Sequence, residues 1–355
     1  MSTYRLDRSF EWNFQNGPAY DGGFPAVPDT PTKEFFGIPV NSRIGIAASV
    51  LVNQRWGELY ARLGFDLLTY KTVRIRERRC HNFPNWFFVS DGFDLREEDK
   101  DTPLVRLARR SADPLGLTGA GSFGMPSRVP EFWQDDIRST RKVLGAGQAL
   151  IVSIVATPVP SMTPEEMAAE FGELAEIVSA AGAQVVEANL SCPNVRAGEG
   201  ELYQDAQMVR RVGKEVRAAA GNNPVTLKLG YIPDDTQLAA VLQAADGLVD
   251  GVVLINGVNR KVVDPDGSAT FGPGRETCGI IGQGLRPVAI DAVIQAVNIV
   301  QRDRLNLKII GTGGIAKPQD AAEFFDAGAY AVFSASGAIF DPHLAARIKR
   351  EYPEW

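Results

Sequence analysis

Apolar and polar positions along the chain predict a regular alternation of strands and helices. From Arg43 onward, short apolar runs typical of buried strands are followed by longer stretches whose apolar residues have helical spacing. The strand candidates are Ile44–Ala48, Asp66–Lys71, Ala149–Ala156, Gln184–Asn189, Val225–Leu229, Gly251–Asn256, Leu307–Gly311 and Tyr330–Ser334. The helix candidates are Gln54–Leu63, Pro130–Leu144, Pro164–Ala181, Leu202–Ala220, Thr236–Ala245, Pro287–Arg302, Pro318–Ala327 and Pro342–Arg350.

Eight such units predict an α/β fold of the (β/α)₈ TIM-barrel type. A doubly wound open sheet is the alternative, but it would not require eight units. Residues 1–36 are rich in Gly, Pro and aromatic residues and lack periodicity, so we expect an irregular N-terminal arm that wraps the core. The barrel would then occupy residues 37–355.

Polar residues gather at the carboxyl ends of the predicted strands, where the active sites of such barrels lie. Lys71 ends the second strand, Asn189 ends the fourth and is soon followed by Cys192, Lys228 lies near the end of the fifth, and Asn256 ends the sixth. A single lysine at a strand end is often merely solvated. The same bias at most of the strand ends favours a functional site.

The run Asn189-Leu190-Ser191-Cys192-Pro193-Asn194 places two carboxamides, a hydroxyl and a thiol where a strand passes into a loop. The thiol can act as a base or nucleophile if its pKa falls from about 8.5 towards neutrality. A polar turn with a buried cysteine is the alternative interpretation of this run.

Two glycine-bearing loops follow the last two strands, which is the usual phosphate site of this barrel. They read Gly311-Thr312-Gly313-Gly314-Ile315 and Ala335-Ser336-Gly337, and Gly279, Gly282 and Gly284 follow the sixth strand. Glycines let backbone N–H groups approach an anion closely. Because no GxGxxG fingerprint follows the first strand and no P-loop is present, a mononucleotide is the natural fit. Lys71 and Lys228 would stabilise negative charge on a reduced flavin.

Composition excludes several classes of protein. The chain has 355 residues and a formal net charge of −6, which argues against a nucleic-acid partner. No apolar stretch is long enough to span a membrane, and the N-terminus has no apolar core of a secretory signal. The three cysteines are widely separated, which argues against a disulfide framework, and two histidines are too few for a histidine-based metal site. A cytoplasmic protein is therefore expected.

These motifs resemble the dihydroorotate dehydrogenase family, with the dihydropyrimidine dehydrogenase barrel as a relative. The similarity covers roughly residues 37–340, and its most specific part is the run from Asn189 to Asn194. Supporting motifs are Ala47-Ala48-Ser49, Tyr70-Lys71-Thr72, Leu227-Lys228-Leu229, Ile255-Asn256 and Ile310-Gly-Thr-Gly-Gly-Ile315.

The resemblance implies an FMN-dependent CH–CH oxidoreductase of pyrimidine metabolism that oxidises dihydroorotate to orotate. Cys192 would remove a proton from C5, a hydride would pass from C6 to FMN N5, and Lys71 would assist catalysis. The implied substrate contacts are Lys71, Gly124, Met125, Asn189, Asn194 and Asn256. The implied FMN contacts are Ala48, Ser49, Lys71, Thr72, Asn189, Lys228, Gly282, Gly313, Gly314, Ala335 and Ser336.

The resemblance has departures that leave the substrate open. Gly121 and Gly257 stand where the family has an asparagine and a hydroxyl residue, and the flap over residues 79–85 lacks the family's arginine. An additional segment near 86–119 is either a solvated insertion or a lid or partner surface over the strand ends.

Three alternative functions stay open. They are the same chemistry on another cyclic amide or dihydropyrimidine, a flavin-binding protein without catalysis, and a phosphate-sugar barrel enzyme. The electron acceptor (fumarate, NAD through a partner subunit, or another oxidant) and a homodimer are likewise open.

Overall fold

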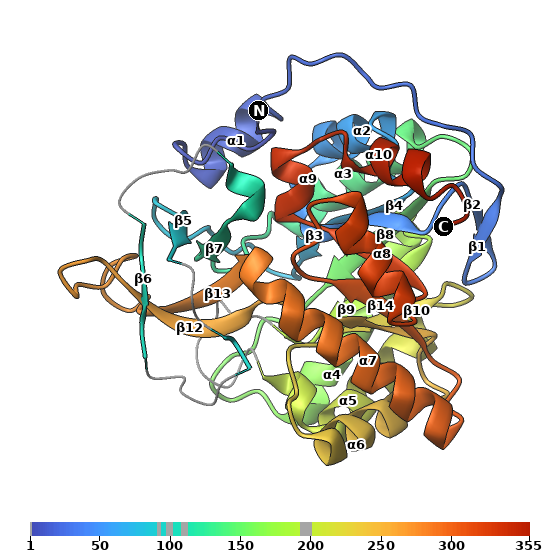
Figure 1. The fold of residues 1–355 in the computed structure, drawn as a ribbon. Coiled ribbons are helices and arrows are strands. Elements are labelled where there is room, and N and C mark those ends of the chain that lie inside the picture. Colours follow the sequence, from blue (N-terminus) through green and yellow to red (C-terminus); the bar gives the residue numbers. More distant parts are fainter. Residues whose placement is uncertain (1, 91–93, 97–101, 108–112, 192–200) are drawn as a thin grey trace.

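A computed structural model describes residues 2–90, 94–96, 102–107, 113–191 and 201–355 (Figure 1). Parallel strands form a closed barrel in the order β10-β11-β14-β15-β3-β4-β8-β9, which confirms the predicted TIM barrel. The barrel strands are β3 (Ile44–Leu51), β4 (Leu67–Val73), β8 (Ala149–Ile154), β9 (Val185–Asn189), β10 (Val225–Lys228), β11 (Gly251–Leu254), β14 (Lys308–Thr312) and β15 (Ala331–Ser334). Each overlaps one predicted strand.

Helices surround the barrel (Figure 1). They are α2 (Gln54–Arg62), α3 (Pro130–Val143), α4 (Pro164–Ala181), α5 (Ala206–Ala219), α6 (Asp235–Ala245), α7 (Arg286–Asp303), α8 (Pro318–Asp326), α9 (Ser336–Phe340) and α10 (Leu344–Glu351). The helix predicted from Leu202 instead begins with a 3₁₀ turn, Leu202–Gln204, and α5 starts after it. Asp205 separates the two because its side chain accepts a hydrogen bond from the Gln207 amide and caps α5.

A hairpin closes the amino end of the barrel. Its strands β1 (Lys33–Phe35) and β2 (Ile38–Val40) are antiparallel, and Phe35 and Val40 are buried among apolar side chains of the barrel interior. The hairpin crosses residue 36, so the predicted boundary between arm and barrel is not a break in the backbone structure. The division into two units at that residue stays a prediction.

The arm itself is not wholly irregular as predicted, because it contains the helix α1 (Phe10–Asn16). The Ser9 hydroxyl accepts a hydrogen bond from the Trp12 amide at the start of α1, and Gly17 ends it with a φ of 78°. Phe10 is buried against the core. An amphipathic pattern of only two turns is too short to stand out in the sequence, and tertiary contacts stabilise such helices.

The segment near 86–119 is part of a second sheet and not a simple surface insertion. Its strands β5 (Trp86–Val89), β6 (Leu104–Val105) and β7 (Thr118–Gly121) combine with β12 (Val258–Val263) and β13 (Thr277–Gly282) in the order β5-β7-β13-β12-β6. The two parts of this sheet come from distant parts of the chain and lie together beside the barrel (Figure 1). Trp86, Phe88 and Val89 are buried in it.

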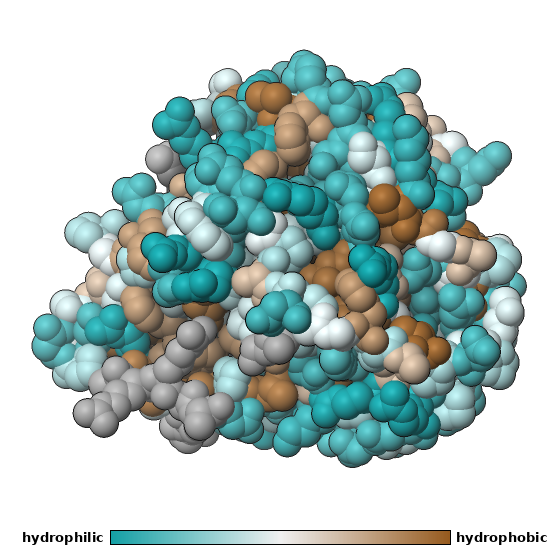
Figure 2. All heavy atoms as spheres, turned by 90° about the horizontal axis from the view of Figure 1, so that it is seen from above, coloured by the Kyte–Doolittle hydropathy of each residue, from teal (hydrophilic) through white to brown (hydrophobic). Residues whose placement is uncertain are grey.

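Hydrophilic residues cover much of the face shown in Figure 2, with smaller apolar areas between them. Large apolar side chains that are exposed, such as Phe24, Phe83 and Ile294, come from separate segments. In the part of the chain that the structure describes, no helix is both long and apolar enough to cross a bilayer.

Candidate active site

A cavity of about 1270 Å³, including its open mouth, lies at the carboxyl ends of the barrel strands. Both the barrel and the second sheet contribute to its wall. The predicted site residues that line it are Ala48, Ser49, Lys71, Thr72, Met125, Asn189, Lys228, Asn256, Gly282, Gly313, Gly314, Ala335 and Ser336. The barrel topology therefore brings together residues from nearly every strand end.

Three predicted residues stand apart from this set. Cys192 and Asn194 lie outside the described residues. Gly124 has a φ of +74° and packs against His81, since a Cβ there would come within 2.4 Å of the His81 Nε2 atom. Gly124 thus supports the turn that presents Met125 to the cavity.

Two carboxamides hold the start of the loop that leads to Cys192. The Asn189 side-chain oxygen accepts a hydrogen bond of 3.1 Å from the Ser191 amide. The Asn256 side-chain nitrogen donates to the Ser191 carbonyl, and its oxygen accepts from the Gly257 amide at 3.0 Å. Because each carboxamide has further donor and acceptor capacity, both can also bind a ligand.

The loops after β14 and β15 pack too closely against neighbouring residues to carry a side chain at Gly314 or Gly337. Gly314 has a φ of +77°, and a Cβ there would come within 2.6 Å of the Arg286 Cβ. At Gly337, in the loop after β15, a Cβ would lie 2.0 Å from the Ile315 carbonyl oxygen. Gly313, Gly314, Ala335 and Ser336 of these loops line the cavity and form a cradle whose backbone N–H groups could approach an anion such as a phosphate.

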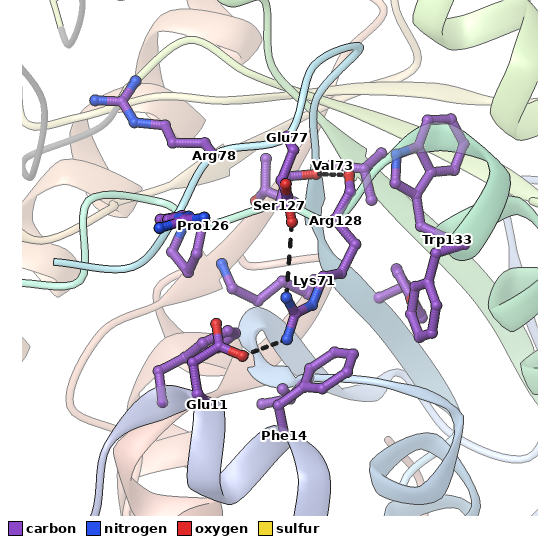
Figure 3. Close-up of a pocket in the computed structure, with 16 residues that line it drawn as sticks. Glu11, Phe14, Lys71, Val73, Glu77, Arg78, Pro126, Ser127, Arg128 and Trp133 are labelled. Carbon is purple, nitrogen blue, oxygen red and sulfur yellow. Dashed lines mark hydrogen bonds and ion pairs between the residues drawn. The ribbon is translucent and has the colours of Figure 1, made fainter.

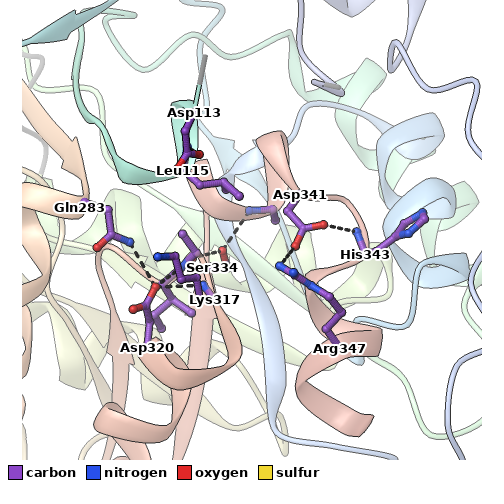
Figure 4. Close-up of polar contacts among 12 residues, drawn as sticks. Asp113, Leu115, Gln283, Lys317, Asp320, Ser334, Asp341, His343 and Arg347 are labelled. Carbon is purple, nitrogen blue, oxygen red and sulfur yellow. Dashed lines mark hydrogen bonds and ion pairs between the residues drawn. The ribbon is translucent and has the colours of Figure 1, made fainter. Parts of the chain in front are cut away.

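Buried and partly buried polar contacts fix the shape of this cradle (Figure 4). The Asp320 carboxylate accepts hydrogen bonds of 2.9 Å from the amides of Ala316 and Lys317. Gln283 donates to the Gly314 carbonyl at 2.7 Å, and the Ser334 hydroxyl donates to the Ile315 carbonyl at 2.8 Å. The loop is therefore held in one conformation by side chains from α8, β15 and the segment after β13.

A second cavity of about 420 Å³ adjoins the first and shares Lys71 and Thr72 with it (Figure 3). Arg128 spans this cavity, with ion pairs to Glu11 of α1 and, at 3.7 Å, to Glu77 after β4. The arm is thereby tied to the segment that follows the strand carrying Lys71.

An arginine from the β12–β13 hairpin reaches the flap of residues 79–85. Arg275 donates to the carbonyls of Asn82 at 2.7 Å, Pro84 at 2.8 Å and Ser122 at 3.1 Å. The flap lacks the arginine of the family motif, but a guanidinium from elsewhere holds its backbone.

We expect Arg275→Met to loosen the flap. Hydrogen bonds from a charged donor contribute about 1.5–3 kcal/mol, so amide hydrogen exchange over residues 79–85 should rise about 10- to 100-fold. Arg302→Met is the control, because exposed Arg302 pairs with its neighbour Asp303. Unchanged exchange in the flap of Arg275→Met would show that other contacts hold it.

Neither of the described cysteines can serve as a base near neutral pH. Burial raises the pKa of the Cys80 thiol to about 12, although Lys71 acts in the opposite direction. Burial also raises the pKa of Cys278 to about 12. Both thiols stay protonated, and a protonated thiol does not abstract a proton.

Several residues that line the main cavity were missed in the sequence. Tyr4 and Phe10 come from the arm, Trp86 from β5 and Phe123 from the loop after β7. Their aromatic character alone does not distinguish them from core residues. Gly279, on β13, and Thr312, at the end of β14, belong to glycine patterns that pointed to the site.

A closed parallel barrel with an anion cradle, two lysines and anchored carboxamides at one end defines an enzyme of the α/β-barrel class. A family model described as dihydroorotate dehydrogenase matches residues 100–355. The dihydroorotate dehydrogenase of Dictyostelium discoideum is 33% identical over 365 residues, which span 97% of this chain and 95% of that protein. The chain belongs to the dihydroorotate dehydrogenase family.

Other relatives match over shorter lengths. A dihydroorotate dehydrogenase B (NAD(+)) catalytic subunit of Maridesulfovibrio salexigens is 36% identical over 189 residues, or 53% of this chain and 59% of that protein. A dihydroorotate dehydrogenase A (fumarate) of Limosilactobacillus reuteri is 32% identical over 183 residues, or 51% and 56%. The crystal structure of DHODH from Eimeria tenella, in complex with ferulenol, matches with a TM-score of 0.74 at 17% identity. That match covers 96% of this chain and 88% of the other, and it shows the fold alone.

Proposed function

We propose that this chain binds FMN and oxidises dihydroorotate to orotate. The observation that carries the proposal is the main cavity, where the glycine cradle, Lys71, Lys228 and the anchored Asn189 and Asn256 converge. Membership of the family supports the same reaction.

The chain's residues suit the two ends of FMN. Gly313, Gly314, Ala335 and Ser336 would hold the phosphate, with their backbone amides as donors. Lys228 on β10 is only 6% exposed and lines the cavity, so its ammonium would face the ring system. Bound FMN supplies a two-electron acceptor for the substrate's hydride.

Cys192 is the proposed base for the proton at C5 of the substrate. It directly follows Ser191, whose backbone both Asn189 and Asn256 hold. The high pKa values of Cys80 and Cys278 remove the other cysteines as candidates. Lys71 would hold the substrate from β4, and Asn189, Asn194 and Asn256 would bind its amide edges by donor–acceptor pairs.

A second candidate, the same chemistry on a different cyclic amide, is favoured by one observation. A Cβ at residue 257 would lie 2.8 Å from the Ile280 carbonyl oxygen, so β13 excludes the hydroxyl residue that the family has there. Gly121, which also lines the cavity, offers no side chain either. Two unpaired polar groups on orotate would cost about 2–6 kcal/mol in total, roughly 30- to 10⁴-fold in affinity.

Titrating the oxidised, FMN-loaded protein with orotate tests the choice between these substrates. For the proposed reaction we expect dihydroorotate to reduce the flavin. An orotate affinity much weaker than low micromolar together with slow reduction by dihydroorotate would favour the second candidate. Low-micromolar orotate binding with fast reduction would contradict the altered-substrate candidate. A preparation that binds no FMN would contradict both candidates.

The oxidant that receives the electrons is a separate question. The relatives' names include NAD(+) and fumarate, and either could serve this chain, NAD(+) through a partner subunit. Reoxidation of the reduced protein by fumarate, by NAD(+) and by a quinone distinguishes these routes. A homodimer and a cytoplasmic location remain part of the proposal.

A further inference from the structure

A carboxyl group is buried inside the barrel directly below the proposed flavin site. Glu187 lies on β9 and is 1% exposed. In the strand register it is aligned with Ser153 of β8 on one side and Thr226 of β10 on the other. Within the described ranges, its Oε1 atom has no hydrogen-bond partner. An unsatisfied buried polar atom is costly, so its position needs a physical explanation.

The next layer of the barrel contains two cavity residues. Asn189 of β9 is aligned with Lys228 of β10, and both line the cavity. Because side chains two residues apart in a strand face the same side, Glu187 and Thr226 point into the barrel one layer beneath this pair. The lysine that faces the cofactor therefore has a carboxyl group beneath it on the neighbouring strand.

The pKa of the Glu187 carboxyl is raised by its surroundings. Burial raises the pKa of the Glu187 carboxyl, while the Lys228 ammonium and a hydrogen bond from Ser153 act in the opposite direction. Thr72, which lines the cavity, donates to the Ser153 hydroxyl at 3.1 Å. Thr72 and Ser153 thus connect the cavity to Glu187, and among the described residues Lys228 is the charged group that acts on the pKa of this carboxyl.

We propose that Glu187, in its ionised form, is a positioning residue that acts through Lys228: its charge offsets part of the charge of the Lys228 ammonium and thereby lowers the reduction potential of bound FMN. The inference rests on the proposed function, in which Lys228 faces the flavin. The physical reason is electrostatic. A negative charge near the cofactor disfavours the reduced form, which carries more negative charge than the oxidised form.

The experiment is a redox titration of FMN-loaded protein against a dye of known potential. Glu187→Gln keeps the shape of the side chain and removes its charge. At a fixed potential we expect the ratio of reduced to oxidised FMN to rise at least tenfold, which is about 30 mV for a two-electron couple. Glu187→Asp retains the charge and should stay within about threefold of the wild type.

Thr226→Val is the matched control, because it removes a buried polar group of the same layer without changing a charge. Its potential should equal that of the wild type. If Glu187→Gln does not fold, Ser153→Ala replaces it: losing the hydrogen bond that favours the carboxylate should shift the ratio in the same direction by a smaller factor.

The outcomes separate this inference from the proposed function. A wild-type protein that binds no FMN overturns both. Bound FMN whose potential is the same in the wild type and Glu187→Gln, or in Ser153→Ala where that variant is used, overturns the role of Glu187 alone. An equal shift in Thr226→Val would also overturn it, because loss of polarity and not charge would then be the cause.

Discussion

Gly314→Val is expected to give a folded protein without bound FMN. The residue has a φ of +77°, and a Cβ would lie 2.6 Å from the Arg286 Cβ and 3.0 Å from the Arg286 Cα. The loop could relieve these contacts only by moving away from α7, and Gln283 and Asp320 hold it in place. Such a movement of the loop would disrupt the cradle that we assign to the phosphate.

The measurement is the amount of FMN per chain after purification, read from the flavin absorbance. Gly247→Val is the matched control, since Gly247 also has a positive φ, of +72°, but a Cβ added there would meet nothing within 4 Å. Both variants carry a backbone strain of about 1–2 kcal/mol. A difference between them in the amount of bound FMN therefore reports the loss of the cradle and not the strain. Stoichiometric FMN in Gly314→Val would place the phosphate elsewhere.

Cys192→Ala should bind FMN normally and lose most of its rate of flavin reduction. A positioned general base contributes roughly 10²–10⁴-fold, so reduction by substrate in a single turnover should slow by at least about a hundredfold. The FMN contacts that we assign do not involve the thiol, and neither the absorbance nor the thermal stability of the FMN-loaded protein should change greatly.

Cys80→Ser serves as the control for this variant. Cys80 lies in the flap, and its pKa of about 12 leaves it protonated at neutral pH. In the Cys80→Ser variant, substrate should reduce the flavin at the wild-type rate. If Cys192→Ala is reduced as fast as the wild type, another group removes the proton.

The barrel and most of the candidate site could be predicted from the sequence for one physical reason. Each barrel strand is a short apolar run and each helix has its own amphipathic pattern, so the information is local. Parallel topology then places all the carboxyl ends at one end of the barrel. The sequence therefore predicts that residues as distant as Lys71, Asn189 and Ser336 share one cavity, and all three line it in the structure.

Contacts between distant segments could not be predicted in this way. The sheet that joins β5 and β7 to β12 and β13 depends on pairing between parts of the chain that are far apart. The contacts of Arg275 with the flap carry no sequence signal, because backbone carbonyls accept them. Gly124 is predicted to contact the substrate, whereas its positive φ and the packing of His81 against it emerge only from the structure.

The sequence by itself determined the α/β-barrel class, the strand ends that bear functional groups and the family, because these follow from local periodicity and short motifs. Only the tertiary structure decided which arm and second-sheet residues line the cavity, that Gly257 leaves no room for a side chain, and that Glu187 lies beneath Lys228. Those features depend on register and close packing between segments, which no local pattern encodes.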